Sequence, residues 1–310
     1  MAADSSSLKT SDIVAQGLRG RRMDVSGVVF QGLLLLALLI SLAFLVTLLA
    51  DVFRTGWSVL ADRGWDFLNS PVSSIAERAG VRQGIVGSML LMTFVVFLAF
   101  PIGIGSAIYL EEYAPNTRLT RFITVNIRNL AGVPSIVYGL LGLAIFVKLL
   151  VGYTGGRSVI SGGITIAILV LPIVIITASE ALRAVPSSIR EAGYGVGATK
   201  WEVVRSHVLP AAAPGILTGT VLSLSRALGE TAPLLLVGAT TGFLATGGQS
   251  LYHQLYSNFT SLPTVVFSWS RNPSGGFRSA TAAAIIVLLL LTLTANAAAI
   301  ILRNRYERKW

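Results

Sequence analysis

Long runs of apolar residues constrain this chain more than any other feature. A run of about 20 such residues forms a helix as long as the hydrocarbon core of a bilayer is thick. The composition agrees, because 53% of the residues are hydrophobic and only 12% are charged, about half the charged share of soluble domains. We therefore predict an all-α integral membrane protein with six transmembrane helices. The predicted spans are residues 27–50, 84–110, 122–151, 160–181, 211–237 and 280–302.

Lysine and arginine are unevenly shared between the two sides that these spans define. If the N-terminus is cytoplasmic, 15 basic residues lie on the cytoplasmic side and 8 lie outside. An excess of positive charge marks cytoplasmic segments. We therefore expect both termini in the cytoplasm, with an N-terminal segment at 1–26, an external loop at 51–83 and a basic tail at 303–310. This distribution accounts for the net charge of +10 without a nucleic-acid partner.

Several kinds of site are excluded by the residue types present. The chain has no Cys and two His residues, so disulfides, thiolate ligands and histidine-rich metal sites are not expected. It lacks a GxxxxGK[ST] sequence and therefore does not hydrolyse ATP by itself. The spans also hold no paired histidines or acidic clusters of the kind a membrane-embedded enzyme needs. We expect no catalytic residue and no cofactor bound by this chain.

An arginine and a glutamate interrupt the fifth apolar run, SLSRALGETAPLLLV. A charge at bilayer depth costs at least ~2.5 kcal/mol, so it is normally paired or used. Arg226 and Glu230 are four residues apart and share a helix face, on which Ser223 also lies. If the helix begins near Ala213, Arg226 lies ~20 Å along it, near the middle of the bilayer.

The chemistry of this pair allows two interpretations. Arginine offers a planar fork of donors that matches phosphate oxygens. We predict that Arg226 attracts an anion in a transient central cavity and that Glu230 compensates its charge when the cavity is empty, with Ser223 and Thr231 beside them. The alternative is a buried ion pair that fixes packing against a partner subunit.

The segment 182–210 is the one long polar connection between spans on the predicted cytoplasmic side. It contains two short stretches of helix-forming residues separated by glycines, LRAVPSSIREAGYGVGATKWEVVRSHVLP. It is too polar to insert into a bilayer, which indicates a docking element. A channel or a membrane scaffold would have no need of such an element.

This loop resembles the EAA coupling loop of type I ABC importer permeases. The match departs from the motif at two positions, since Gly193 stands where alanine is usual and His207 where isoleucine is usual. The resemblance implies a coupling helix that contacts a separate ATPase subunit. The matching residues are Glu191, Ala192, Gly193, Gly197, Leu209 and Pro210.

Three further stretches resemble phosphate-specific permeases in the order that family has. They are FPIGIGSAIYLEEYAP, NLAGVPSIVYGLLGLAIF and SRALGETAPLLLVGA, in which Glu-Thr-Ala-Pro is typical of the A subunit. The resemblance covers 84–302 and implies a type I ABC importer permease core there. One departure is Ile176-Thr177-Ala178-Ser179-Glu180, where the family often has Arg-Thr-Thr-Glu-Glu, so a second pathway arginine is missing.

The resemblance also implies an assembly in the bacterial inner membrane. Its other members are a second, C-type permease, two ATPase subunits that bind ATP and Mg²⁺, and an extracytoplasmic phosphate-binding protein. Two alternatives within the class stay open. The substrate is another oxyanion, such as sulfate, molybdate or phosphonate, or the chain is the C-type phosphate permease.

Overall fold

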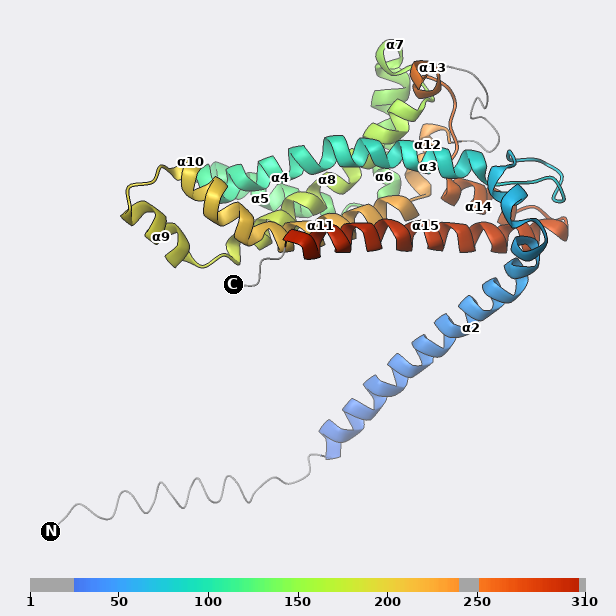
Figure 1. The fold of residues 1–310 in the computed structure, drawn as a ribbon, viewed down its shortest axis with the longest axis horizontal. Helices are drawn as coiled ribbons and strands as arrows, with labels where there is room; N and C mark the ends of the chain where they lie inside the picture. The colour runs from blue at the N-terminus through green and yellow to red at the C-terminus, as the bar shows by residue number, and fades with distance from the viewer. Residues whose placement is uncertain (1–24, 240–250, 307–310) are drawn as a thin grey trace. The chain divides into compact units, whose positions relative to one another are not determined.

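The computed structural model describes residues 25–239 and 251–306, which form helices and the turns between them, with no strand among them (Figure 1). Residues 1–24, 240–250 and 307–310 lie outside the described part, and with them most of the predicted N-terminal segment and the end of the basic tail. The chain divides into two units, 1–52 and 53–310.

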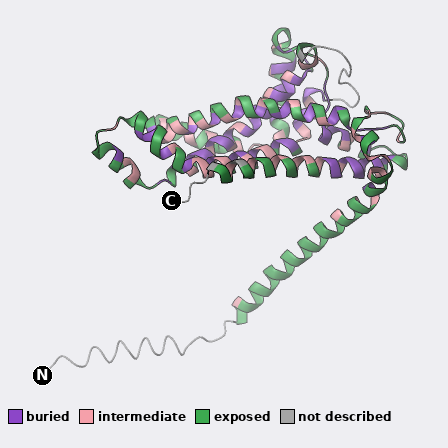
Figure 2. Cartoon of the chain, in the orientation of Figure 1, coloured by how far each residue is buried: buried purple, intermediate pink, exposed green. Residues whose placement is uncertain are grey.

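The first predicted span lies in α2 (Val25–Asn69), which begins in the first unit and ends in the second. In the first unit its apolar side chains are exposed, as Figure 2 shows, which suits a helix surrounded by lipid or by another protein. The helix continues to Asn69, where we expected an external loop from residue 51. Arg63 interrupts it with φ −135° and ψ 19°, and its guanidinium donates to the carbonyls of Ala76 and Ala79.

The second and fourth predicted spans pack side by side in the same direction. The second consists of α3 (Arg82–Phe94), η1 (Val95–Ala99), α4 (Phe100–Ile108) and η2 (Tyr109–Tyr113), and the fourth is α8 (Val159–Arg183). Gly103 lies against Val174, and farther along Glu111 lies against Arg183. Because the residue numbers rise together, these helices are parallel, and the chain between them must cross back.

That return is made by a broken helix, where we predicted one continuous span at 122–151. The pieces are α5 (Arg118–Ala131) and α6 (Ser135–Gly142) with its continuation η3 (Leu143–Leu149), bent by 100°. Pro134 explains the break, since proline has no N–H and disfavours a helical residue before it. Gly142 lies against Thr165, and α5 lines a cleft with residues 175–183 of α8, so the broken helix runs antiparallel to α8. Counted as one span, it brings the candidate membrane spans among the described residues from five to six.

The polar loop contains α9 (Ser187–Gly195) and α10 (Lys200–Val203), here called the α9–α10 hairpin. Through η4 (Val204–Val208) it leads into α11 (Leu209–Gly229). Gly219 of α11 lies against Thr177, so α11 runs antiparallel to α8. We predicted one helix over 211–237, but α11 ends at Gly229 and a separate α12 (Ala232–Val237) follows.

The last span, α15 (Gly276–Tyr306), packs antiparallel to α11. Ser225 donates to Asn296 Oδ1 at 2.5 Å, and Arg303 donates to Thr218 at 3.3 Å. The short helices α7 (Val151–Thr154), α13 (Leu251–Leu255) and α14 (Leu262–Ser270) lie between the spans in sequence. Where α11 begins, a buried apolar cluster beneath the hairpin joins Leu182, Val203, Val208 and Ile216.

Close packing of α4 on α8 depends on the small size of Gly103. An added methyl group at Gly103 would lie 2.7 Å from Val174 Cγ1, whereas one at Gly105 would meet nothing within 4 Å. Gly103→Ala is expected to be less stable than Gly105→Ala by ~1–3 kcal/mol, the usual cost of overpacking. Both changes remove one helical glycine, so the difference in thermal unfolding in detergent isolates the contact. Equal unfolding temperatures would contradict the close contact of α4 with α8 at Gly103.

Candidate functional site

Two helix breaks and one proline inside a continuous helix lie at one level of the bundle. α5 and α6 separate at Pro134, α11 and α12 separate at Glu230, and α8 contains Pro172. The contacts of Gly142 with Thr165 and of Gly219 with Thr177 set the helix registers that bring these breaks together. Discontinuous helices at mid-membrane are typical of transporter substrate sites.

Arg226 lies in the last turn of α11, directly before its break. Gly215 marks the hairpin end of the helix, since it lies against Ala181 in the last turn of α8. At ~1.5 Å per residue, Arg226 is about 16 Å farther along α11, well inside a ~30 Å hydrocarbon core. Its Nε lies 3.4 Å from Glu230 Oε1, with side-chain exposures of 47% and 14%. The guanidinium is thus paired by one long contact and is open on its other side.

The other two predicted pathway residues are placed differently. Ser223 is fully buried, and its hydroxyl donates to Gly219 O at 2.9 Å within its own helix. It is therefore not brought together with the exposed Arg226, although their spacing had placed them on one face. Thr231 stands in the break at the start of α12 and is partly buried.

The α6 side of the break is fixed by Tyr138, which sequence reasoning did not single out. Its hydroxyl donates to Leu130 O at 2.8 Å and so joins α6 to the end of α5 across the bend. α6 also packs tightly on α12, since a methyl group at Gly139 would lie 2.6 Å from Pro233 Cα. The first turn of α6 has no side-chain cap, which leaves the positive end of its dipole at this level.

The predicted coupling residues lie in and beside the α9–α10 hairpin. Gly193 is buried where the two arms meet, because a methyl group there would lie 2.7 Å from Val203 Cγ2. Gly197 has φ +83°, a left-handed conformation that favours glycine, and turns the chain between the arms. Thr199 and Glu202 then form a capping box that starts α10.

The outer surface of the hairpin combines exposed carboxylate and apolar groups. Glu191 and Ala192 are both exposed on α9. Exposed apolar side chains accompany them, and sequence reasoning missed these because single apolar residues in a polar loop carry little signal. They are Tyr194, Val196 and Trp201.

The remaining predicted residues lie where the hairpin joins α11. Leu209 is half-buried and packs on the cluster beneath the hairpin, and Pro210 is exposed in the first turn of α11. His207, which departs from the motif, is exposed as well.

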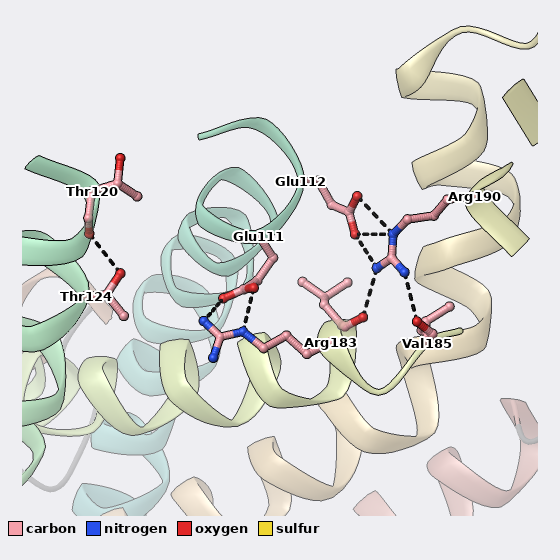
Figure 3. Close-up of polar contacts among 8 residues, drawn as sticks. Glu111, Glu112, Thr120, Thr124, Arg183, Val185 and Arg190 are labelled. Atoms are coloured by element: carbon pink, nitrogen blue, oxygen red, sulfur yellow. Dashed lines mark hydrogen bonds and ion pairs between the residues drawn. The ribbon is translucent and has the colours of Figure 1, made fainter. Parts of the chain in front are cut away.

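The π-helical turn η2 holds two neighbouring carboxylates that reach different arginines (Figure 3). Glu111 accepts two bonds of 2.7 Å from Arg183 at the end of α8. Glu112 accepts bonds of 2.6 and 3.2 Å from Arg190 on α9. Neighbouring residues on a helix point apart. Pointing apart is what lets each one reach its own arginine.

The fold and both parts of the site can be compared with known proteins. The family described as "Binding-protein-dependent transport system inner membrane component" matches residues 99–308. The chain belongs to this family. It is accordingly a multi-pass inner-membrane permease subunit of an importer that works with a partner permease and a binding protein.

Two curated members of the binding-protein-dependent permease family illustrate the similarity. "Phosphate transport system permease protein PstA 1" of Mycobacterium tuberculosis (strain CDC 1551 / Oshkosh) is 33% identical over 267 residues, 85% of this chain and 84% of that protein. "Phosphate transport system permease protein PstC" of Mesorhizobium japonicum is 31% identical over 234 residues, 68% of this chain and 71% of that protein.

Among solved structures, the crystal structure of a bacterial alginate ABC transporter in complex with a periplasmic protein is similar, with a TM-score of 0.63. The identity is 14%, and the match covers 92% of this chain and 99% of that chain. This likeness confirms the predicted type I ABC importer permease fold.

The contact of Gly193 with Val203 between the two arms of the hairpin can be tested by substitution. Gly193→Ala is expected to lower the free energy of opening residues 187–203 by ~1–3 kcal/mol, because the methyl group collides with Val203. Gly195→Ala is the matched control, since a methyl group there meets nothing within 4 Å. Hydrogen exchange of the hairpin amides measures both. Equal protection in the two variants would mean that the arms do not depend on this contact.

Proposed function

We propose that this chain is the A-type transmembrane subunit of an ATP-driven importer of inorganic phosphate. Its relatives named as phosphate transport permeases support the substrate, and the match to the PstA protein covers 85% of this chain, against 68% and 79% for two PstC proteins. The A-type assignment is also supported by the Glu-Thr-Ala-Pro sequence that begins at Glu230.

The observation that carries this proposal is the position of Arg226 at the break between α11 and α12. Its side chain is half-exposed and is held by one 3.4 Å contact to Glu230. The planar guanidinium fork matches two oxygens of a phosphate ion. An anion that displaces Glu230 keeps the Arg226 guanidinium paired with a negative charge.

Weak binding at this position suits conduction. A transport site must attract its ion without trapping it. Glu230 competes with the substrate for the same guanidinium, which lowers the affinity of the permease. Capture and selectivity then belong to an extracytoplasmic binding protein, and a second, C-type permease supplies the other wall of the pathway.

Energy comes from outside this chain, which has no Walker A sequence. The α9–α10 hairpin, with Glu191, Ala192 and its exposed Tyr194 and Trp201, is the docking surface for a separate ATPase. Two such subunits bind ATP and Mg²⁺ and hydrolyse the nucleotide. The hairpin is on the cytoplasmic side, and both termini share that side.

ATP-driven uptake of labelled phosphate into liposomes that hold the complete assembly tests this function. We expect uptake that excess unlabelled sulfate does not suppress. Suppression by sulfate, molybdate or a phosphonate would reassign the substrate to that oxyanion, and uptake that is absent with every oxyanion would refute the proposal.

The role of the Arg226–Glu230 pair is tested by Arg226→Gln/Glu230→Gln, which removes both charges and so leaves no charge without a partner. We expect uptake to fall by roughly tenfold or more, because a hydrogen bond to a charged group contributes ~1.5–3 kcal/mol. Arg183→Gln/Glu111→Gln removes a chemically identical pair outside the centre and should transport normally. Unimpaired uptake in the first variant would reduce Arg226 and Glu230 to a packing role.

A further inference from the structure

The end of the second transmembrane span is attached to the α9–α10 hairpin at a site that the coupling motif does not include. Glu112 belongs to η2 and Arg190 to α9, so their bond joins a transmembrane element to the hairpin. The same guanidinium donates to Val185 O at 2.8 Å and to Leu182 O at 3.0 Å. Arg190 therefore holds three segments together: η2, the end of α8 and α9 (Figure 3).

Burial makes this bond hard to break without consequence. The side chain of Glu112 is 4% exposed and that of Arg190 22% exposed. Removing one partner leaves the other as an uncompensated charge away from water, which is strongly unfavourable. The bond between Glu112 and Arg190, here called the Glu112–Arg190 joint, therefore stays formed while the hairpin moves. The elements that it connects then move with the hairpin.

A second contact ties the other arm of the hairpin to the same turn. The Nζ atom of Lys200 lies 5.2 Å from the centre of the Tyr113 ring, within the range of a cation–π contact. Because Gly193 and Val203 pack the arms against each other, both arms follow η2 as one body.

The neighbouring pair supplies an internal comparison. Arg183 and Glu111 form an equally short bidentate bond, but both belong to transmembrane elements and neither reaches the hairpin. Arg183 is also 50% exposed, so water screens the pair, and exposed pairs contribute little. Two adjacent carboxylates thus serve two different connections.

We propose that Glu112 and Arg190 are positioning residues that transmit the movement of the ATPase-driven hairpin to the second transmembrane span. This inference rests on the proposed function, since it assumes an ATPase on the hairpin. It assigns the pair to coupling and leaves docking to the outer surface of the hairpin. Without the Glu112–Arg190 joint, ATP hydrolysis continues but no longer moves the second transmembrane span.

The test compares Glu112→Gln with Glu111→Gln in the complete assembly in liposomes. Each change removes one carboxylate charge with almost no change of shape. For Glu112→Gln we expect the ATPase to remain bound and active, while phosphate carried per ATP falls by roughly fivefold or more, the lower end of typical coupling between sites. Glu111→Gln should match the native protein in both readings. If Glu112→Gln fails to fold, Arg190→Lys, which keeps the charge but loses the fork, is measured in its place.

A distance measurement separates this proposal from the proposed function, because it needs no substrate. The chain has no Cys, so spin labels at Asn116→Cys, three residues after η2, and at Ser188→Cys on α9 report the separation of these two segments. We expect one narrow distance distribution with and without ATP, and a broad one in Glu112→Gln alone. Identical distributions in the two glutamine variants would overturn the joint, as would loss of the ATPase from Glu112→Gln. Failure of native phosphate uptake would refute the substrate assignment only.

Discussion

The parallel packing of the second span on α8 is the constraint on which the rest of the structure depends. Gly103 allows the two backbones to approach, and Glu111 pairs with Arg183 where α8 ends. Two parallel neighbours require a crossing between them, and α5 and α6 make that crossing. Because Pro134 interrupts it opposite the break after Gly229, the packing of two helices places two discontinuities together.

Three arginine–carboxylate pairs of the described residues differ in burial and geometry, and we assign them different roles on that basis. The Glu112 pair is the driest and has the shortest contact, 2.6 Å, and it fastens the hairpin. The Glu111 pair is as well formed but more exposed to solvent, and it connects only two transmembrane elements. The Arg226 pair lies deep in the bundle yet has the longest contact, 3.4 Å. A pair that is both central and loosely made is the one that a ligand can open.

Much of the architecture follows from the sequence, because apolar length acts over whole segments. The apolar spans and the polar hairpin were predictable in this way, and the resemblance of the motifs predicted the importer fold. The breaks were not, because Pro134 and the Glu230 turn are local events inside apolar runs. Spacing placed Ser223 on the Arg226 face, but an ideal helix does not show which side neighbours cover. The Glu112–Arg190 joint is a contact between residues far apart in sequence. A single sequence does not show such contacts until its fold is known.

The most direct test of the central claim is a structure of the complete assembly trapped with phosphate in the membrane cavity. We predict phosphate oxygens within hydrogen-bonding distance of the Arg226 guanidinium, with Glu230 moved away from it. Phosphate bound elsewhere, with the Arg226–Glu230 contact intact against the partner permease, would contradict it.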